Sequence, residues 1–270
     1  MDIRKWIQKY DVDCDVKYSS LNTRKTYKNG VREFLEYFSY EVEPKSISNH
    51  KIKVWLLQSK TLNTRKHRQC SVNSFYKLTV RMPSKISKIP YPKNQRKLPR
   101  VIETDYLLKT INNISNIKHK ALIATGFDLS LRRDEVINIK MCNIDRKRML
   151  VLIENGKGKK DRYVKLSDEL LLIWDAYYST YKPITYLFNG ESKTSLKYSP
   201  GSYNLVVKKY LGNQYSTHTL RHSGATSMLE NGTPLPIIQE LLGHESIKTT
   251  KIYTHVSLNT LQNVKSPLSK

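Results

Sequence analysis

Apolar residues in the first third of the chain recur with the period of an α-helix. Tyr27, Val31, Phe34, Leu35 and Phe38 follow one another at i, i+4, i+7, i+8 and i+11. This spacing places them in a single stripe along one helix face. The pattern therefore predicts a long amphipathic helix that buries this stripe.

Two more helices are predicted in the same part. A short one carries Ile52, Trp55 and Leu56, and Ser48 or Asn49 is placed to cap its N-terminus. A third runs from about residue 63 to residue 80. Residues 1–87 are therefore predicted to form a helical domain.

The third helix opens with a basic cluster, Arg65, Lys66, His67 and Arg68. Cationic side chains on one helix turn are suited to lie against phosphates. A solvated helix face explains the same charges equally well. Arg65, Lys66 and Arg68 are candidate DNA-binding residues on this basis.

Prolines interrupt the pattern between the third helix and residue 100. Pro83, Pro90, Pro92 and Pro99 prevent a continuous helix here. From Pro83 to Arg100 the chain carries six basic residues, and no acidic residue occurs before Glu103: Lys85, Lys88, Lys93, Arg96, Lys97 and Arg100. We therefore predict an extended basic linker over residues 88–100, whose Arg96 and Lys97 are candidate contacts to DNA.

Helical and strand patterns mix in residues 101–270, which are predicted to form a second, α+β domain. Thr104 is expected to cap a helix over about 105–111, and an apolar helix is expected over 118–126. Residues 149–153 and 162–166 are typical of two strands, and Asn155-Gly156 between them favours a hairpin turn. Helical patterns dominate beyond them. The fold class is thus mainly α with a small β-sheet.

Composition adds a strong positive charge to this picture. The chain has 270 residues, of which 47 are Lys or Arg and 23 are acidic, a formal net charge of +24. Such an excess repels itself in a compact fold unless a polyanion neutralises it, so nucleic acid is the leading candidate partner. An anionic membrane surface is the alternative, but no apolar run approaches the roughly 20 residues that span a bilayer. A ribosomal or chromatin protein would share this composition.

The three cysteines and the N-terminus indicate a compartment. Cys14, Cys70 and Cys142 are scattered and form no Cys-x-x-Cys pair. This argues for a reducing interior and against structural zinc. Residues 1–10 are charged and contain no apolar stretch of a signal peptide. A cytoplasmic protein is expected.

A His-x-x-Arg pair, His218 and Arg221, is the first candidate for chemistry. Residues three apart share a helix face, so these two side chains can grip one small anion. Ordinary surface residues would give the same match. His218 and His222 also have the i, i+4 spacing of zinc ligands, but the glutamate of zinc proteases and a third ligand are missing.

The predicted hairpin and the C-terminal region hold two further candidates. Gly156-Lys157-Gly158 lacks the order of a nucleotide-binding loop and instead predicts a tight turn that projects Lys157, with Lys159 behind it. A solvent-exposed basic hairpin is the plainer interpretation. Residues 236–242 predict a short apolar helix closed by Gly243; His244 follows, and Tyr253 comes nine residues after it. The chain contains 18 tyrosines, and only the accompanying motifs distinguish Tyr253 from the others.

Taken in order, these segments resemble the catalytic domain of tyrosine recombinases, the superfamily of Xer recombinases, phage integrases and type IB topoisomerases. The family pattern is Arg, Lys in a β-hairpin, His-x-x-Arg, Leu-Gly-His and then Tyr nine residues on. This chain fills it with Arg132, Lys157, His218, Arg221, His244 and Tyr253. The resemblance covers roughly residues 98–265, and residues 261–268 resemble the tail of archaeal integrases.

The chain departs from the family pattern at the first arginine. The family usually places it two residues after Thr-Gly, whereas residues 127–131 intervene here after Thr125-Gly126. Arg132 is preferred to Arg133 because Glu135 then falls three residues later, at the usual acidic position.

The resemblance implies a site-specific DNA recombinase or integrase that forms a 3′-phosphotyrosyl intermediate and needs no ATP, metal or other cofactor. Tyr253 would be the nucleophile and Lys157 the general acid. Arg132 and Arg221 would neutralise the phosphate, which bidentate guanidinium groups do better than lysine. His218 would help to deprotonate Tyr253, and His244 would add a hydrogen bond to the phosphate.

Glu135 would orient Arg132 in the reaction that the resemblance implies. The partner would be double-stranded DNA, bound by a homo-tetramer on paired sites. A helical N-terminal domain of the core-binding (SAM-like) kind would clamp DNA together with the catalytic domain. A type IB topoisomerase-like enzyme and a catalytically inactive DNA-binding relative are the alternatives.

Overall fold

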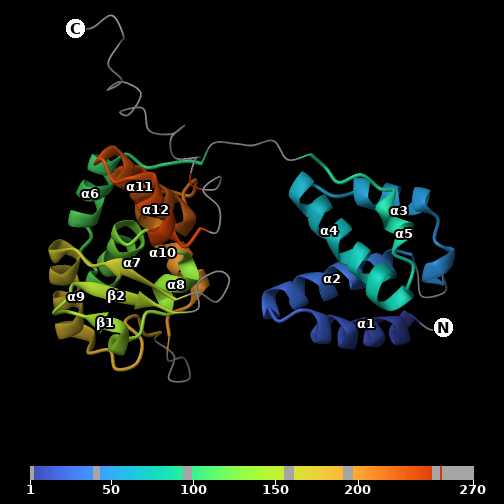
Figure 1. Cartoon of the computed structure of the whole chain (residues 1–270), viewed down its shortest axis with the longest axis horizontal. Coiled ribbons are helices and arrows are strands. Elements are labelled where there is room, and N and C mark those ends of the chain that lie inside the picture. Colours follow the sequence, from blue (N-terminus) through green and yellow to red (C-terminus); the bar gives the residue numbers. More distant parts are fainter. Residues whose placement is uncertain are drawn as a thin grey trace, which may run out of the picture. The chain divides into compact units, whose positions relative to one another are not determined.

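The computed structural model describes residues 3–38, 43–93, 99–154, 161–190, 197–244 and 250. Contacts between residues divide the chain into two compact units, Met1–Arg96 and Lys97–Lys270, which are described separately (Figure 1). The elements of the first unit are α1 (Ile3–Lys17), α2 (Leu21–Tyr37), η1 (Pro44–Ser46), α3 (Asn49–Leu57), α4 (Leu62–Phe75), η2 (Tyr76–Val80) and α5 (Ser84–Ser87).

The first unit is a helical bundle around the predicted apolar stripe of α2. Phe34 is fully buried, and its ring meets those of Trp55 and Tyr76 edge to face at centroid distances of 5.1 and 6.1 Å. Gly30 lets α2 approach α4 closely, because a Cβ atom there would lie 2.5 Å from the Ser71 hydroxyl oxygen. Packing of aromatic rings thus supplies much of this small core.

The helix predictions for the first unit agree with the structure. The Ser48 hydroxyl caps α3 by accepting a hydrogen bond of 3.3 Å from the backbone N–H of Lys51. The third predicted helix is α4, and the five-residue π-helical turn η2 continues it to Val80. Asn49 is the first residue of α3, not its cap.

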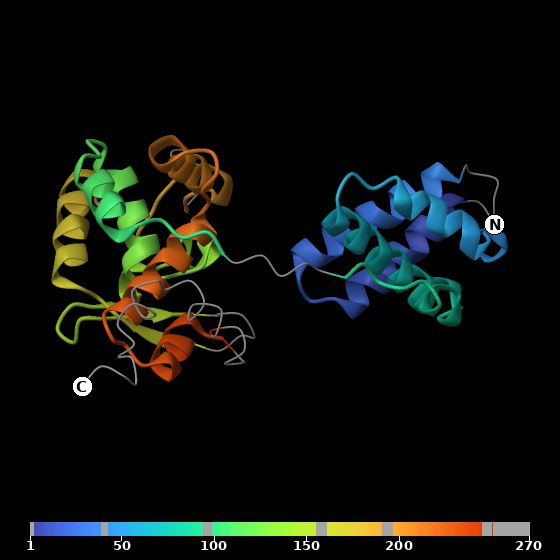
Figure 2. The ribbon, with the colours of Figure 1, turned by 90° about the horizontal axis from the view of Figure 1, so that it is seen from above.

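The second unit combines helices with one small sheet. Its elements are α6 (Thr104–Asn112), α7 (Ile117–Asp128), α8 (Arg133–Ile137), η3 (Met141–Asn143), β1 (Ile144–Asp145), β2 (Leu150–Ile153), β3 (Arg162–Lys165), α9 (Asp168–Tyr181), α10 (Pro200–Leu211), α11 (Thr217–Glu230) and α12 (Leu235–Leu242). The three strands are antiparallel in the order β1-β2-β3, with Val151 opposite Val164 and Ile153 opposite Arg162. Figure 2 shows the same ribbon from above, with α12 in red-orange. The mainly helical fold class with a small sheet is confirmed.

Helix α7 forms the buried centre of the second unit. Residues 121–126 are all buried, and α7 packs against α9 on one side and α11 on another. The Trp174 indole of α9 donates a hydrogen bond of 2.8 Å to the Thr125 hydroxyl. Gly224 allows α11 to lie directly on the end of α7, because a Cβ atom there would be 2.1 Å from the Phe127 carbonyl oxygen.

Two details of the second unit differ from the sequence-based expectation. Thr104 is not a cap: it is the first residue of α6, and Glu103 takes the N-cap position without a side-chain hydrogen bond. Strand β1 was not predicted, because two residues are too few to display an alternating pattern. The turn expected at Asn155-Gly156 lies outside the described residues.

Candidate active site

Helix α11 carries the predicted His-x-x-Arg pair near its N-terminus. The Arg221 guanidinium is buried and donates hydrogen bonds to two backbone carbonyls, 3.0 Å to that of Ser130 and 2.7 Å to that of Leu242. His218, one turn earlier, is exposed. The helix therefore presents a fixed guanidinium and an accessible imidazole from the same region.

Arg132 and Glu135 are joined at the start of α8. Arg132 is the N-cap residue, and its backbone N–H donates 2.8 Å to the Glu135 carboxylate, one half of a capping box. The Arg132 guanidinium donates 2.7 Å to the other carboxylate oxygen. The neighbouring Arg133 makes no such contact with Glu135 among the described residues and pairs with exposed Asp134 at 3.1 Å.

His244 is held by the turn that ends α12. Gly243 adopts a left-handed conformation with φ of 60°, and the His244 N–H donates 3.1 Å back to the Gln239 carbonyl. The His244 Nε2 lies 3.1 Å from Arg221 Nη2, and its Nδ1 lies 2.9 Å from the Thr250 hydroxyl. Because a guanidinium can only donate, Nε2 accepts here and the ring proton sits on Nδ1.

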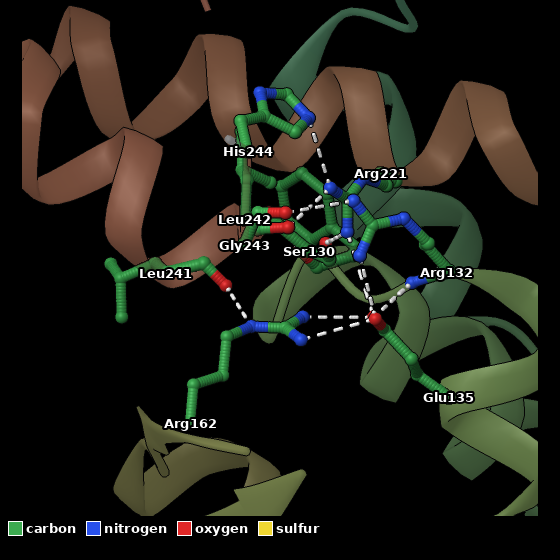
Figure 3. A network of polar contacts seen from close by, with 10 residues as sticks. Ser130, Arg132, Glu135, Arg162, Arg221, Leu241, Leu242, Gly243 and His244 are labelled. Atoms are coloured by element: carbon green, nitrogen blue, oxygen red, sulfur yellow. Dashed lines mark hydrogen bonds and ion pairs between the residues drawn. The ribbon is translucent and has the colours of Figure 1, made fainter. Parts of the chain in front are cut away.

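Arg162 is part of the same cluster, although no role was predicted for it. From β3 it donates to both oxygens of the Glu135 carboxylate, at 3.1 and 2.8 Å, and to the Leu241 carbonyl at 2.6 Å (Figure 3). The only sequence signal was strand alternation, which places Arg162 on the same face as buried Val164.

The charges of the cluster hold Glu135 ionised. Burial alone would raise the pKa of its carboxyl, but the hydrogen bonds and charges of Arg162 and Arg132 outweigh burial and lower the pKa to about 2. Arg221 adds a third guanidinium at 3.6 Å. Three guanidinium groups thus share one carboxylate, and the site retains a positive charge suited to an anion.

The two histidines of α11 are biased toward their neutral forms. Partial enclosure of the ring and the positive charges of Arg221 and Arg133 lower the pKa of His218. Burial, followed by the neighbouring His218, lowers the pKa of His222 to about 4. A neutral imidazole at His218 can accept a proton near neutral pH.

The structure brings together four of the six predicted catalytic residues, Arg132, His218, Arg221 and His244, with Glu135 among them. Lys157, Lys159, Arg96, Lys97 and Tyr253 lie outside the described residues. Within the described ranges, no group of three or more His, Cys, Asp or Glu side chains could hold a metal ion, and no helix is long and apolar enough to cross a membrane.

The remaining predicted DNA contacts lie on α4 of the first unit. Arg68 is already engaged there, since its guanidinium donates to Glu33 at 3.2 Å and stacks over the Trp55 ring at 4.9 Å. Arg65 and Lys66 are half-buried on the same helix. Their contact with DNA stays a prediction.

Comparison with known proteins places this site in a family. Residues 100–259 match the model of the phage integrase family. The chain is 30% identical over 272 residues to a putative integrase/recombinase of Sinorhizobium fredii, covering 96% of this chain and 87% of the relative. It is 34% identical over 197 residues to the tyrosine recombinase XerA of Pyrococcus horikoshii, covering 71% and 69% of the two chains.

Solved structures share the fold over most of the chain. A crystal structure of XerA recombinase superposes with a TM-score of 0.54 at 25% identity and covers 96% of both chains. A lambda integrase tetramer bound to a Holliday junction gives a TM-score of 0.76 at 14% identity, covering 94% of this chain and 77% of that one, a likeness of fold alone. From the family match and the two sequence relatives, the chain belongs to the phage integrase family and is a site-specific tyrosine recombinase.

Proposed function

We propose that this recombinase cleaves and rejoins double-stranded DNA through Tyr253. The Tyr253 oxygen attacks a phosphodiester, a bond from that oxygen to phosphorus forms, and the bond to the 5′-oxygen breaks. The products are a 3′-phosphotyrosyl link and a free 5′-hydroxyl. A second 5′-hydroxyl reverses the step, so the energy of the bond is retained and no ATP is required.

The observation that carries the proposal is the meeting of Arg132, Arg221 and His244 at one place. Arg132 and Arg221 come from two separate helices, and both contact the turn at the end of α12. The phosphodiester is anionic and repels an attacking oxygen, so the negative charge of the phosphate must be neutralised. Preorganised guanidinium groups supply that help, and removal of one such donor typically costs about 10²–10³ in rate.

Two residues would move protons in this scheme. His218 would take the proton of the Tyr253 hydroxyl, and its lowered pKa supports this role because the ring is neutral at pH 7. Lys157 would protonate the departing 5′-oxygen. Glu135 would orient Arg132, and the guanidinium charges would do the work that metal ions do in other phosphoryl-transfer enzymes.

We further propose a homo-tetramer on paired DNA sites in the cytoplasm, in which the first unit binds the duplex through the basic residues of α4. The lambda integrase relative is described as a tetramer on a Holliday junction, and a XerH relative as bound to its difH substrate. The chain has 47 basic and 23 acidic residues, and this excess of positive charge supports salt-dependent binding to the DNA backbone.

Covalent trapping tests the proposed chemistry. Full-length protein, with EDTA and without ATP, is incubated with nicked duplexes drawn from sequence flanking its own gene, beside Tyr253→Phe. An SDS-resistant adduct on a 3′-phosphate, formed by wild type alone, is the expected result. An adduct of equal yield with Tyr253→Phe would exclude this nucleophile.

The same preparation separates the two alternatives. Recombinant product between two sites supports the recombinase, whereas relaxation of supercoils without recombinants favours the topoisomerase-like activity. Salt-sensitive binding with no adduct on any flanking sequence favours a DNA-binding relative without chemistry.

A further inference from the structure

Three arginines from three different elements converge on the last turn of α12. The carbonyls of Leu241, Leu242 and Gly243 are successive, and each accepts a hydrogen bond from a different guanidinium. Arg162 donates 2.6 Å to Leu241, Arg221 donates 2.7 Å to Leu242, and Arg132 donates 3.2 Å to Gly243. Carbonyls at the end of a helix lack partners within the helix and carry partial negative charge, so cations stabilise them.

The Glu135 carboxylate ties the same three arginines together from the other side. It receives two hydrogen bonds from Arg162, two from Arg132 including the backbone N–H, and a longer ion pair from Arg221 (Figure 3). Each guanidinium therefore bridges the carboxylate and the α12 turn. A shift of any one of them is transmitted to the other two.

Unlike Arg132 and Arg221, Arg162 does not neutralise the phosphate in the proposed reaction. Its side chain is 9% exposed, and its planar fork is directed at the Glu135 carboxylate in bidentate geometry. It also packs against Gly243: a Cβ atom on Gly243 would lie 3.3 Å from Arg162 Nη1. The residue thus spans β3, α8 and the turn that presents His244.

We propose that Arg162 is a positioning residue for the cleavage reaction, an inference that rests on the proposed function. It holds the Glu135 carboxylate and the α12 turn at a fixed separation and thereby sets where Arg132, Arg221 and His244 meet the phosphate.

Substitution by lysine isolates this role. Arg162→Lys keeps a positive charge next to Glu135 but replaces a bidentate fork and an Nε donor by one ammonium group. The carboxylate then loses one of its three arginine partners, or the Leu241 carbonyl loses its hydrogen bond, and the arginines that face the phosphate shift. A displacement of about 1 Å in an active site can cost about 10²-fold in rate.

The experiment compares single-turnover adduct formation on two substrates. One has the natural phosphodiester at the cleavage site, and the other has an uncharged methylphosphonate there. Arg162→Lys and Arg162→Gln are measured beside wild type and Arg146→Lys. Arg146 makes the matched bidentate contact to Asp175, at 2.6 and 2.8 Å, on the exposed surface of the same unit.

A positioning role gives a specific pattern. Arg162→Lys forms the adduct about 10²-fold more slowly than wild type on the phosphodiester. The deficit shrinks at least about ten-fold on the methylphosphonate, because an uncharged phosphorus group no longer needs the arginines to neutralise it. Arg146→Lys retains wild-type rates on both substrates, and DNA affinity changes little in all variants.

Three results would overturn the inference. Wild-type rates in Arg162→Lys would do so, as would an equal deficit on both substrates, since a merely structural loss of active protein is independent of substrate charge. Failure of both Arg162 variants to fold would assign the residue to stability instead. If wild type itself forms no Tyr253 adduct, the proposed function is contradicted, and so is this inference, which rests on it.

Discussion

Replacing Glu135 by Gln should destabilise the second unit strongly, because it removes the buried carboxylate that three arginines share. Glu135 is 7% exposed, and Arg162 and Arg221 beside it are 9% and 4% exposed. The substitution preserves shape and leaves the guanidinium charges uncompensated. Removal of one partner from a buried ion pair typically costs about 3–5 kcal/mol.

The pKa of Glu135 gives an independent magnitude. A carboxyl whose pKa falls from 4.5 to about 2 on folding contributes about 3 kcal/mol of stability at neutral pH. Since the folded-state pKa is depressed, this contribution is complete above pH 4.5 and disappears as pH falls toward 2. The difference in stability between wild type and Glu135→Gln should therefore narrow by about 2 kcal/mol between pH 7 and pH 3.

Urea unfolding followed by tryptophan fluorescence measures this loss in the full chain. Trp6 and Trp55 belong to the first unit and Trp174 to the second, so a Trp6→Phe/Trp55→Phe background reports on the second unit alone. Asp175→Asn is the matched control: it breaks an exposed bidentate pair with Arg146 and should cost no more than about 1 kcal/mol.

Two outcomes would refute the reasoning. A loss for Glu135→Gln no larger than that of the control would mean that the arginines do not depend on this carboxylate. A difference from wild type that stays constant between pH 7 and pH 3 would mean that the carboxyl is not held ionised by them.

Three further predictions follow from the same unit. Gly224→Ala places a Cβ atom 2.1 Å from the Phe127 carbonyl oxygen, so the free energy of unfolding, followed by Trp174 fluorescence, should fall by about 1–3 kcal/mol. Gly201→Ala is the control: the nearest atom to its Cβ lies at 3.5 Å, and it should cause no such loss. Gly243→Ala places a side chain on a residue in the left-handed conformation, at a cost of about 1 kcal/mol, and its Cβ atom presses on Arg162. Formation of the covalent adduct should therefore slow while DNA affinity is retained. An unchanged rate of adduct formation would contradict this. His222 should titrate with a midpoint of about 4 by NMR, and because its folded-state pKa is depressed, stability should decline as pH drops below 6.5; a midpoint near 6.5 would disprove its enclosure.

Local spacing in the sequence was sufficient for much of the fold. The α2 stripe, the Ser48 cap and the two longer strands follow from periodicity and capping rules that act within a few residues. The same holds for pairs within one helix. His218 with Arg221, and Arg132 with Glu135, are three residues apart and share one helix turn.

The meeting of those pairs required the tertiary structure. Arg162 contacts Glu135 across 27 positions and Leu241 across 79, and such contacts leave no periodic trace in one sequence. The partners of the arginines on α12 are backbone carbonyls, which every residue type possesses, so residue identity could not indicate them. The sequence by itself, through its resemblance to the family pattern, predicts which side chains carry the chemistry, Tyr253 and Lys157 among them. Only long-range packing of α8, α11, β3 and α12 decided that the Glu135 carboxylate and the end of α12 organise three arginines. These residues are far apart in the sequence, and they meet only when the whole core of the unit packs.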